Sequence, residues 1–144
     1  MDFMSLAIEQ AKKTDTDIPV GAVIVKDGEV IAKAFNTREK DNDITSHAEI
    51  LAIRKAEQIL NNWRLDNCEL YVTLEPCPMC GWAIIQSRIK TVYFGSYDTN
   101  YGAFTSSIDL RKLSNSKLNV YGGINEEACN ALIKDFFNNL RGQG

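Results

Sequence analysis

Two short segments of the sequence contain the residue types that bind metals and transfer protons. The first is His47-Ala48-Glu49, and the second is Cys77-Pro78-Met79-Cys80. One imidazole and two thiolates suit tetrahedral zinc, and three protein ligands leave the fourth position open to water. An open position is typical of a catalytic zinc site. We therefore expect His47, Cys77 and Cys80 to hold one zinc ion per subunit.

Glu49 is the residue expected to move protons at this site. Two thiolates and a neutral imidazole cancel the charge of zinc, so a nearby base must help to deprotonate the attacking water. Because Glu49 lies two positions after His47 on a helix, the two side chains point in different directions, and Glu49 is free to act as a base. A carboxylate that takes a proton from water and passes it to a ring nitrogen and then to a departing amine fits hydrolysis at an amidine-like carbon.

Each part of this pattern also has a structural interpretation. Ser46-x-x-Glu49 matches a helix capping box, which would make Glu49 a cap, and an isolated His47 is more often a surface or capping residue. A single Cys-x-x-Cys is commonly a redox pair or half of a structural zinc site, which Cys68 and Cys129 could complete. We expect these two cysteines to be buried apolar residues instead. In combination, His-x-Glu followed by Pro-Cys-x-x-Cys is the signature of zinc-dependent nucleobase deaminases.

Apolar periodicity predicts the elements that position these residues. Both chemical segments fall where a loop enters a helix, and there the helix dipole favours thiolates. An Asp27-Gly28 pair predicts a tight hairpin between the first two strands, and the later alternation of strands and helices predicts parallel pairing. Helices are expected at residues 3–11, 48–61, from 78 onward, near 108–113 and at 126–140, and strands at 20–25, 30–35, 70–74, 91–94 and 118–121.

Length and composition limit the class of protein. A chain of 144 residues with 44% hydrophobic and 24% charged residues is expected to form a single domain over residues 1–144. Because the start lacks the features of a signal peptide and no apolar run approaches bilayer-spanning length, we expect a cytoplasmic protein with no membrane partner. The net charge of −3 neither indicates nor excludes a nucleic-acid partner.

The sequence resembles the bacterial tRNA-specific adenosine deaminases over nearly its whole length. This resemblance implies an α/β fold of the cytidine deaminase type, a three-layer α/β/α sandwich around a five-stranded mixed sheet, and a homodimer. It implies that the substrate is the wobble adenosine of a tRNA anticodon arm, flipped into the pocket and converted to inosine. The segments that carry it include residues 19–23, Asn36, residues 47–50, 63–65, 70–80 and 87–89, Phe94-Gly95, Asp98, Gly102-Ala103 and Phe136-Phe137.

The same resemblance implies which residues bind the substrate. Asn36 aligns with a base-contacting asparagine, although an asparagine there also suits a turn that closes the second strand. The segment from Leu74 to Cys77 is expected to present backbone groups to the base and to the leaving amine. The implied substrate-binding residues are Asn36, Ala48, Leu74, Glu75, Pro76 and Asp98.

Several positions depart from the pattern of that family. Ile44 replaces a usual proline and Ser46 a usual alanine, Asn100 and Thr105 differ in the following loop, and residues 138–144 carry few basic side chains. The alternative is a deaminase of free nucleobases or nucleosides, such as guanine or cytosine, which needs no phosphate-binding surface. A zinc-stabilised RNA-binding scaffold is disfavoured by Glu49. Tyr97, Tyr101 and Phe104 are expected either to stack on nucleotides or to pack on the partner subunit.

Overall fold

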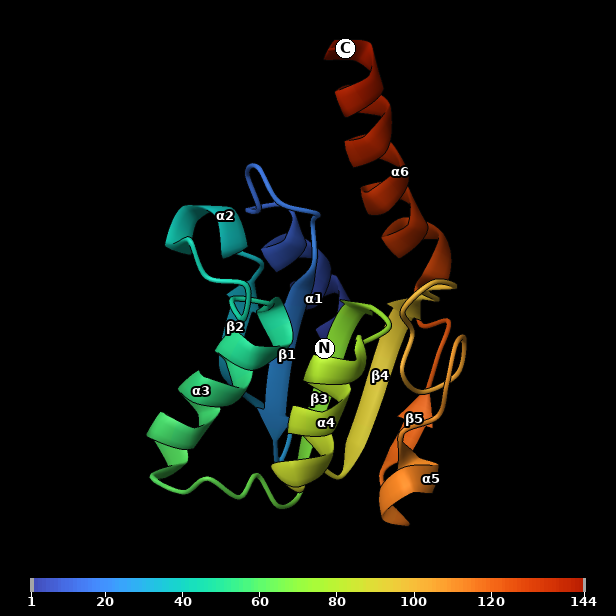
Figure 1. The fold of residues 1–144 in the computed structure, drawn as a ribbon. Helices are drawn as coiled ribbons and strands as arrows, with labels where there is room; N and C mark the ends of the chain where they lie inside the picture. Colours follow the sequence, from blue (N-terminus) through green and yellow to red (C-terminus); the bar gives the residue numbers. More distant parts are fainter. Residues whose placement is uncertain (1, 144) are drawn as a thin grey trace.

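A five-stranded mixed sheet forms the centre of the computed structural model, which describes residues 2–143 (Figure 1). The order across the sheet is β2-β1-β3-β4-β5. Strand β1 is antiparallel to both of its neighbours, whereas β3, β4 and β5 are parallel to one another. The predicted hairpin and the predicted parallel pairing are therefore confirmed. The strands are β1 (Gly21–Lys26), β2 (Glu29–Phe35), β3 (Cys68–Leu74), β4 (Thr91–Ser96) and β5 (Asn119–Tyr121).

The burial pattern of β1 explains why the sheet is covered on both faces. Its first five residues are all buried, as expected for a strand between two helical layers. Ala22 and Ile24 point toward helices α3 (Ala48–Leu60) and α4 (Pro78–Gln86), whereas Val23 and Val25 point toward α1 (Phe3–Ala11) and α6 (Glu126–Gln143). The predicted three-layer α/β/α arrangement is confirmed.

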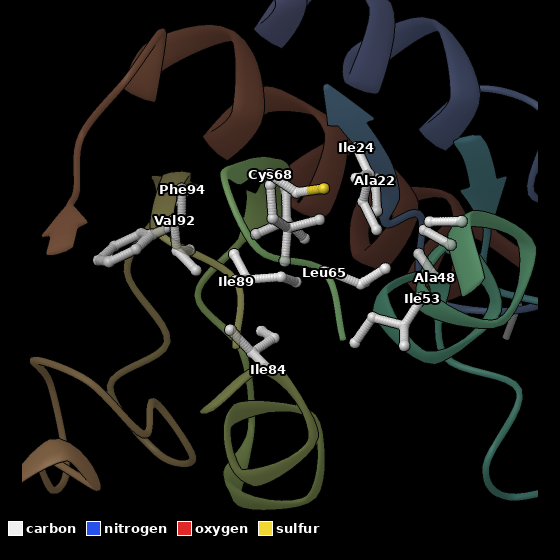
Figure 2. Close-up of a cluster of buried hydrophobic side chains, with 14 of the residues drawn as sticks. Ala22, Ile24, Ala48, Ile53, Leu65, Cys68, Ile84, Ile89, Val92 and Phe94 are labelled. Carbon is white, nitrogen blue, oxygen red and sulfur yellow. The ribbon is translucent and has the colours of Figure 1, made fainter. Parts of the chain in front are cut away.

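The larger core lies between the sheet and the α3–α4 layer (Figure 2). Val92 and Phe94 of β4 share it with Ile53 of α3 and Ile84 of α4, and all four side chains are buried. This packing fixes both helices against one face of the sheet. As a result, the first residues of α3 and α4 meet beside the carboxyl end of β3, where the chemical segments lie.

The hairpin turn follows the chemistry of its two central residues. Asp27 has a φ of 51° and Gly28 a φ of 78°. Left-handed angles at both central positions are typical of a type I′ turn, whose twist matches that of the flanking strands. The Asp-Gly pair therefore sets the register next to the turn, and this register shifts once, between Ile24 and Val25.

Three helices differ from the predictions. Helix α2 (Arg38–Asp41) lies within a segment expected to be a loop, because four residues are too few to show periodicity. Helix α5 (Arg111–Ser114) begins later than expected. Helix α6 extends away from the sheet (Figure 1). The apolar spacing along residues 126–140 predicts that Ala128, Ala131 and Leu140 face inward, and this prediction is wrong, because all three are exposed. None of the helices within residues 2–143 is long and apolar enough to cross a bilayer.

Helix α1 packs so closely on β1 that Gly21 cannot carry a side chain. An added Cβ would overlap the carbonyl oxygen of Ala7 and lie 2.5 Å from the amide nitrogen of Ala11. We predict that Gly21→Ala lowers the free energy of unfolding by about 3 kcal/mol, measured by urea denaturation, because backbone atoms leave no room to relax. Gly28→Asn is the control, since its turn is open and Asn tolerates left-handed φ, and it should cost less than about 1 kcal/mol. Equal effects of the two changes would contradict this packing.

Candidate functional site

Three metal-binding side chains converge at the amino ends of α3 and α4. His47 is the N-cap of α3, Cys77 is the N-cap of α4, and Cys80 lies in the first turn of α4. Nδ1 of His47 lies 3.4 Å from Sγ of Cys80 and 3.8 Å from Sγ of Cys77. The three ligand atoms all lie within 4.8 Å of one another. Zinc bonds to sulfur and nitrogen give a tetrahedron with edges of about 3.6 Å, so this spacing fits the ion.

Local backbone chemistry leaves these side chains free for a metal. A residue at an N-cap usually uses its side chain to bind the first helical N–H groups, but neither His47 nor Cys77 does so. Asn36 supplies that bond for α3, because its Oδ1 accepts from the backbone N–H of Ala48 at 2.8 Å. In α4, Pro78 occupies the first helical position, where its missing N–H needs no partner.

The capping-box interpretation of Glu49 is wrong. That motif would need Ser46 as the N-cap, whereas His47 occupies this position and Glu49 is the second residue of the helix. The Glu49 side chain is buried, with 4% of the residue exposed, and it lies on the wall of the same cavity as His47 and Cys77. Its position next to the three ligands is the one that a proton-transferring group requires.

The charges of the site favour the binding of a cation. A hydrogen bond from Cys80 lowers the pKa of Cys77 to about 4, with His47 adding to the effect against the opposing burial. The hydrogen bond to Cys77, burial and the nearby charge of Glu49 raise the pKa of Cys80, which keeps its proton. Two thiolates and a carboxylate in this site would repel one another, so a divalent ion that binds both sulfurs would replace the proton of Cys80 and relieve the repulsion. The donor set thus fits zinc.

Burial also sets the protonation of Glu49. It raises the pKa of this carboxyl to about 7, although hydrogen bonding and the charge of His47 act in the opposite direction. The imidazole of His47 has a raised pKa because of its hydrogen bond with Cys77, against the effect of burial. A carboxyl group with a pKa near neutral is suited both to accept a proton and to donate it.

A cavity of about 330 Å³ opens beside the three ligands. Of the expected substrate-binding residues, Asn36, Leu74, Glu75 and Asp98 lie on its wall. Ala48 and Pro76 are buried but are not on the wall: the N–H of Ala48 binds Asn36, and the carbonyl of Pro76 accepts from Ala103. The wall also contains Ile18, Val20 and Arg38, which sequence reasoning did not select as site residues, together with Ile44 and Tyr101, which it named only as a departure from the family pattern and as a loop aromatic.

Arg38 is the charged residue of the cavity wall that the sequence pattern gave no reason to select. It lies in α2, and its guanidinium forms an ion pair with the buried Asp17, with Nη2 3.1 Å from Oδ1. Asp17 also accepts from the backbone N–H of Glu39, so one carboxylate holds both Arg38 and the start of α2. An isolated Arg in a polar segment has no periodic or motif signal, and only the ion pair reveals its fixed position.

The positions of the remaining aromatic and cysteine residues show which of them are buried in the core. Phe104 is buried in the core, and Tyr97 packs edge-on against Phe94 with ring centroids 5.0 Å apart. Tyr101 is exposed at the cavity. Cys68 and Cys129 are fully buried, as expected, and lie in the two core clusters rather than at the metal site.

Comparison with known proteins agrees with this geometry. Residues 1–96 match the cytidine and deoxycytidylate deaminase zinc-binding region. The tRNA-specific adenosine deaminase of Bacillus subtilis is 41% identical over 143 residues, spanning 96% of this chain and 89% of the relative. A structure from studies of A-to-I editing by tRNA:A34 deaminases is 40% identical with a TM-score of 0.85, covering 90% of this chain and 97% of that one. A Bacillus subtilis guanine deaminase structure is 44% identical with a TM-score of 0.65, over 68% of this chain and 64% of that one. With His47, Cys77 and Cys80 positioned as possible zinc ligands, the chain belongs to the zinc-binding cytidine and deoxycytidylate deaminase family.

Proposed function

We propose that this protein is a zinc-dependent hydrolase that converts the wobble adenosine of tRNA to inosine and releases ammonia. The observation that carries the proposal is the buried carboxylate of Glu49, which shares a cavity with His47 and Cys77. Similarity to tRNA-specific adenosine deaminases along almost the whole chain supports the choice of substrate. We infer that residues 1–144 act as one catalytic domain in the cytoplasm, where such a substrate is found.

The proposed reaction assigns one task to each group of residues. His47, Cys77 and Cys80 would hold the zinc ion, which when bound would supply a lowered pKa for water at neutral pH. Glu49 would accept one proton from the water that adds to C6 of the base and pass it to the ring nitrogen, and would then accept the remaining proton of the added hydroxyl and deliver it to the departing amine, which leaves as ammonia. Ile18, Val20 and Leu74 line the cavity with apolar surface that would hold the base and exclude solvent. Asn36 is proposed to contact the base, while its amide also fixes the start of α3.

A second candidate is deamination of a free base such as guanine. The similarity to a guanine deaminase structure supports this candidate, as does a cavity of about 330 Å³ that is small enough to suit a single base. Both reactions would use the same ligands and the same carboxylate. They differ in whether phosphate groups contribute to binding.

We also infer a homodimer. The outer side of the α3–α4 layer lies uncovered at the front of Figure 1, and a groove between these helices is lined in part by Ile50, Trp63 and Ala83. Trp63 is 59% exposed and Trp82 is 43% exposed. Large apolar side chains gathered on one face of a protein are typical of an interaction surface.

The substrate can be tested with arginine tRNA that carries adenosine at the wobble position. We expect inosine to form there, and we expect kcat/KM to fall by about tenfold or more between about 50 and 200 mM salt, because phosphate contacts release counterions. Inosine is measured by sequencing the product, and guanine and adenosine are assayed in parallel. Turnover of a free base with no inosine in tRNA would contradict the proposal and support the second candidate.

The role of Glu49 can be separated from the role of the ligands. Glu49→Gln should keep zinc and the fold but lower kcat by about 10² to 10⁴-fold, because only the proton-transferring group is removed. His47→Ala is the matched control, and it should lose zinc as well as activity, measured by elemental analysis of the purified proteins. Wild-type turnover by zinc-loaded Glu49→Gln would show that another group moves the protons.

The dimer can be tested by sedimentation equilibrium. We expect twice the chain mass of 16.1 kDa for the wild type. Trp82→Glu should shift the protein toward the monomer, because a charge would be buried in the interface. Lys134→Glu on the exposed part of α6 is the control and should leave the mass unchanged. A monomeric wild type at micromolar concentration would contradict the inference.

A further inference from the structure

The carboxylate of Glu75 is buried, with 2% of the residue exposed, and is surrounded by one loop. Its Oε1 accepts from the backbone N–H of Asp98 at 3.1 Å and from the hydroxyl of Ser106. Its Oε2 accepts from the backbone N–H groups of Phe104, Thr105 and Ser106 at 3.3, 2.8 and 3.0 Å. Four backbone amides and one hydroxyl therefore converge on a single side chain. Successive backbone N–H groups arranged in this way form a concave site for an anion.

These hydrogen bonds offset the cost of burying the carboxylate. Burial of a charged group is costly unless it is hydrogen-bonded, and four backbone amides and one hydroxyl meet this one. Hydrogen bonds to a charged acceptor are stronger than those between neutral groups. The link between Glu75 and the loop therefore rests on this set of donors.

The loop shows a second, independent adaptation to Glu75. A Cβ added to Gly102 would fall on the Glu75 carboxylate, so the loop backbone approaches Glu75 as closely as a glycine permits. The next residue, Ala103, donates its N–H to the carbonyl of Pro76 at 2.9 Å. Glu75 and Pro76 thus hold the loop at two successive positions, and the residue that follows them is the zinc ligand Cys77.

This loop carries two side chains of the cavity wall. Asp98 and Tyr101 both line the cavity, and Oδ1 of Asp98 accepts from the backbone N–H of Tyr101 at 3.1 Å. Neither residue packs in the core, since Tyr101 is 67% exposed. The distance of this part of the wall from the metal ligands therefore depends on the attachment of the loop to Glu75.

We propose that Glu75 is a positioning residue whose buried carboxylate fastens residues 98–106 beside the zinc-binding segment and thereby sets the affinity of the cavity for its substrate. This role is separate from the expected contact with substrate, which involved backbone groups, because it belongs to the side chain. The proposal rests on the proposed function only for the identity of the substrate. The attachment itself is a property of the protein alone.

The attachment can be tested with two variants that act on opposite sides of it. Glu75→Gln keeps the size of the side chain but places an NH₂ group against backbone N–H donors, and Gly102→Ala keeps the carboxylate but displaces it. For both zinc-loaded proteins we expect faster hydrogen exchange at the amides of residues 98 and 104–106, with unchanged protection in α3 and α4. We also expect KM to rise about tenfold while kcat changes less than about twofold. Glu75→Asp, which keeps the charge, should recover part of the effect on KM.

Glu9→Gln is the matched control, because it makes the same chemical change on the exposed side of α1. It should leave exchange, KM and kcat unchanged. A fall in kcat with wild-type exchange and KM in Glu75→Gln would mean that the carboxylate acts in the reaction, and the proposal would be overturned. Faster exchange with an unchanged KM would also overturn it. If Glu75→Gln fails to fold, Gly102→Ala decides.

The test of Glu75 can be interpreted even if the proposed function is wrong. Hydrogen exchange needs no substrate, so it reports on the attachment even if tRNA is not deaminated. In that case KM and kcat are measured with the free base that the wild type does convert. Absence of tRNA turnover by the wild type would contradict the proposed function. A difference in exchange and KM between the wild type and the variants would support the role of Glu75.

Discussion

Two sulfurs and a carboxylate must be held together in a buried site, and this electrostatic constraint governs the rest of the structure. Without a cation, the negative forms of Cys77, Cys80 and Glu49 oppose one another, as the opposite pKa shifts of the two cysteines indicate. The fold meets this constraint by directing the amino ends of two helices toward the same point. Each helix presents its positive end and its unpaired N–H groups, and a parallel β3–α4–β4 unit places one of them directly after a strand.

Polar side chains other than the metal ligands hold the backbone segments around the site in place. The side chain of Asn36 joins the carbonyl of Ile18 to the first N–H of α3, so three separate segments are fixed by one amide. Asp17 does the same for α2 through Arg38 and the N–H of Glu39. These polar side chains surround the cavity and act on its walls, whereas the apolar core beneath keeps the helices in place.

Much of this arrangement could be predicted from the sequence, because the signals are local. The spacing of His47, Glu49, Cys77 and Cys80 indicated the chemistry, and the alternation of strands and helices indicated the parallel part of the sheet. Glu75 was selected only through a family resemblance, and the task of its side chain was missed, since its partners are backbone amides 23 to 31 residues later and backbone groups leave no trace in composition. The exposure of α6 was missed for a related reason. An apolar stripe shows which face of a helix can be buried, but it does not show how far the sheet extends beneath that helix.

The separation of capping from metal binding at His47 affects how the protein acquires its ion. Asn36 stabilises the start of α3 through contacts that do not involve the imidazole, and Pro78 starts α4 without help from the thiol. The scaffold is therefore assembled by bonds that remain when zinc is absent, unlike that of a zinc finger, which is unfolded without metal. We therefore expect the ion to displace the proton of the Cys80 thiol without rebuilding the start of either helix.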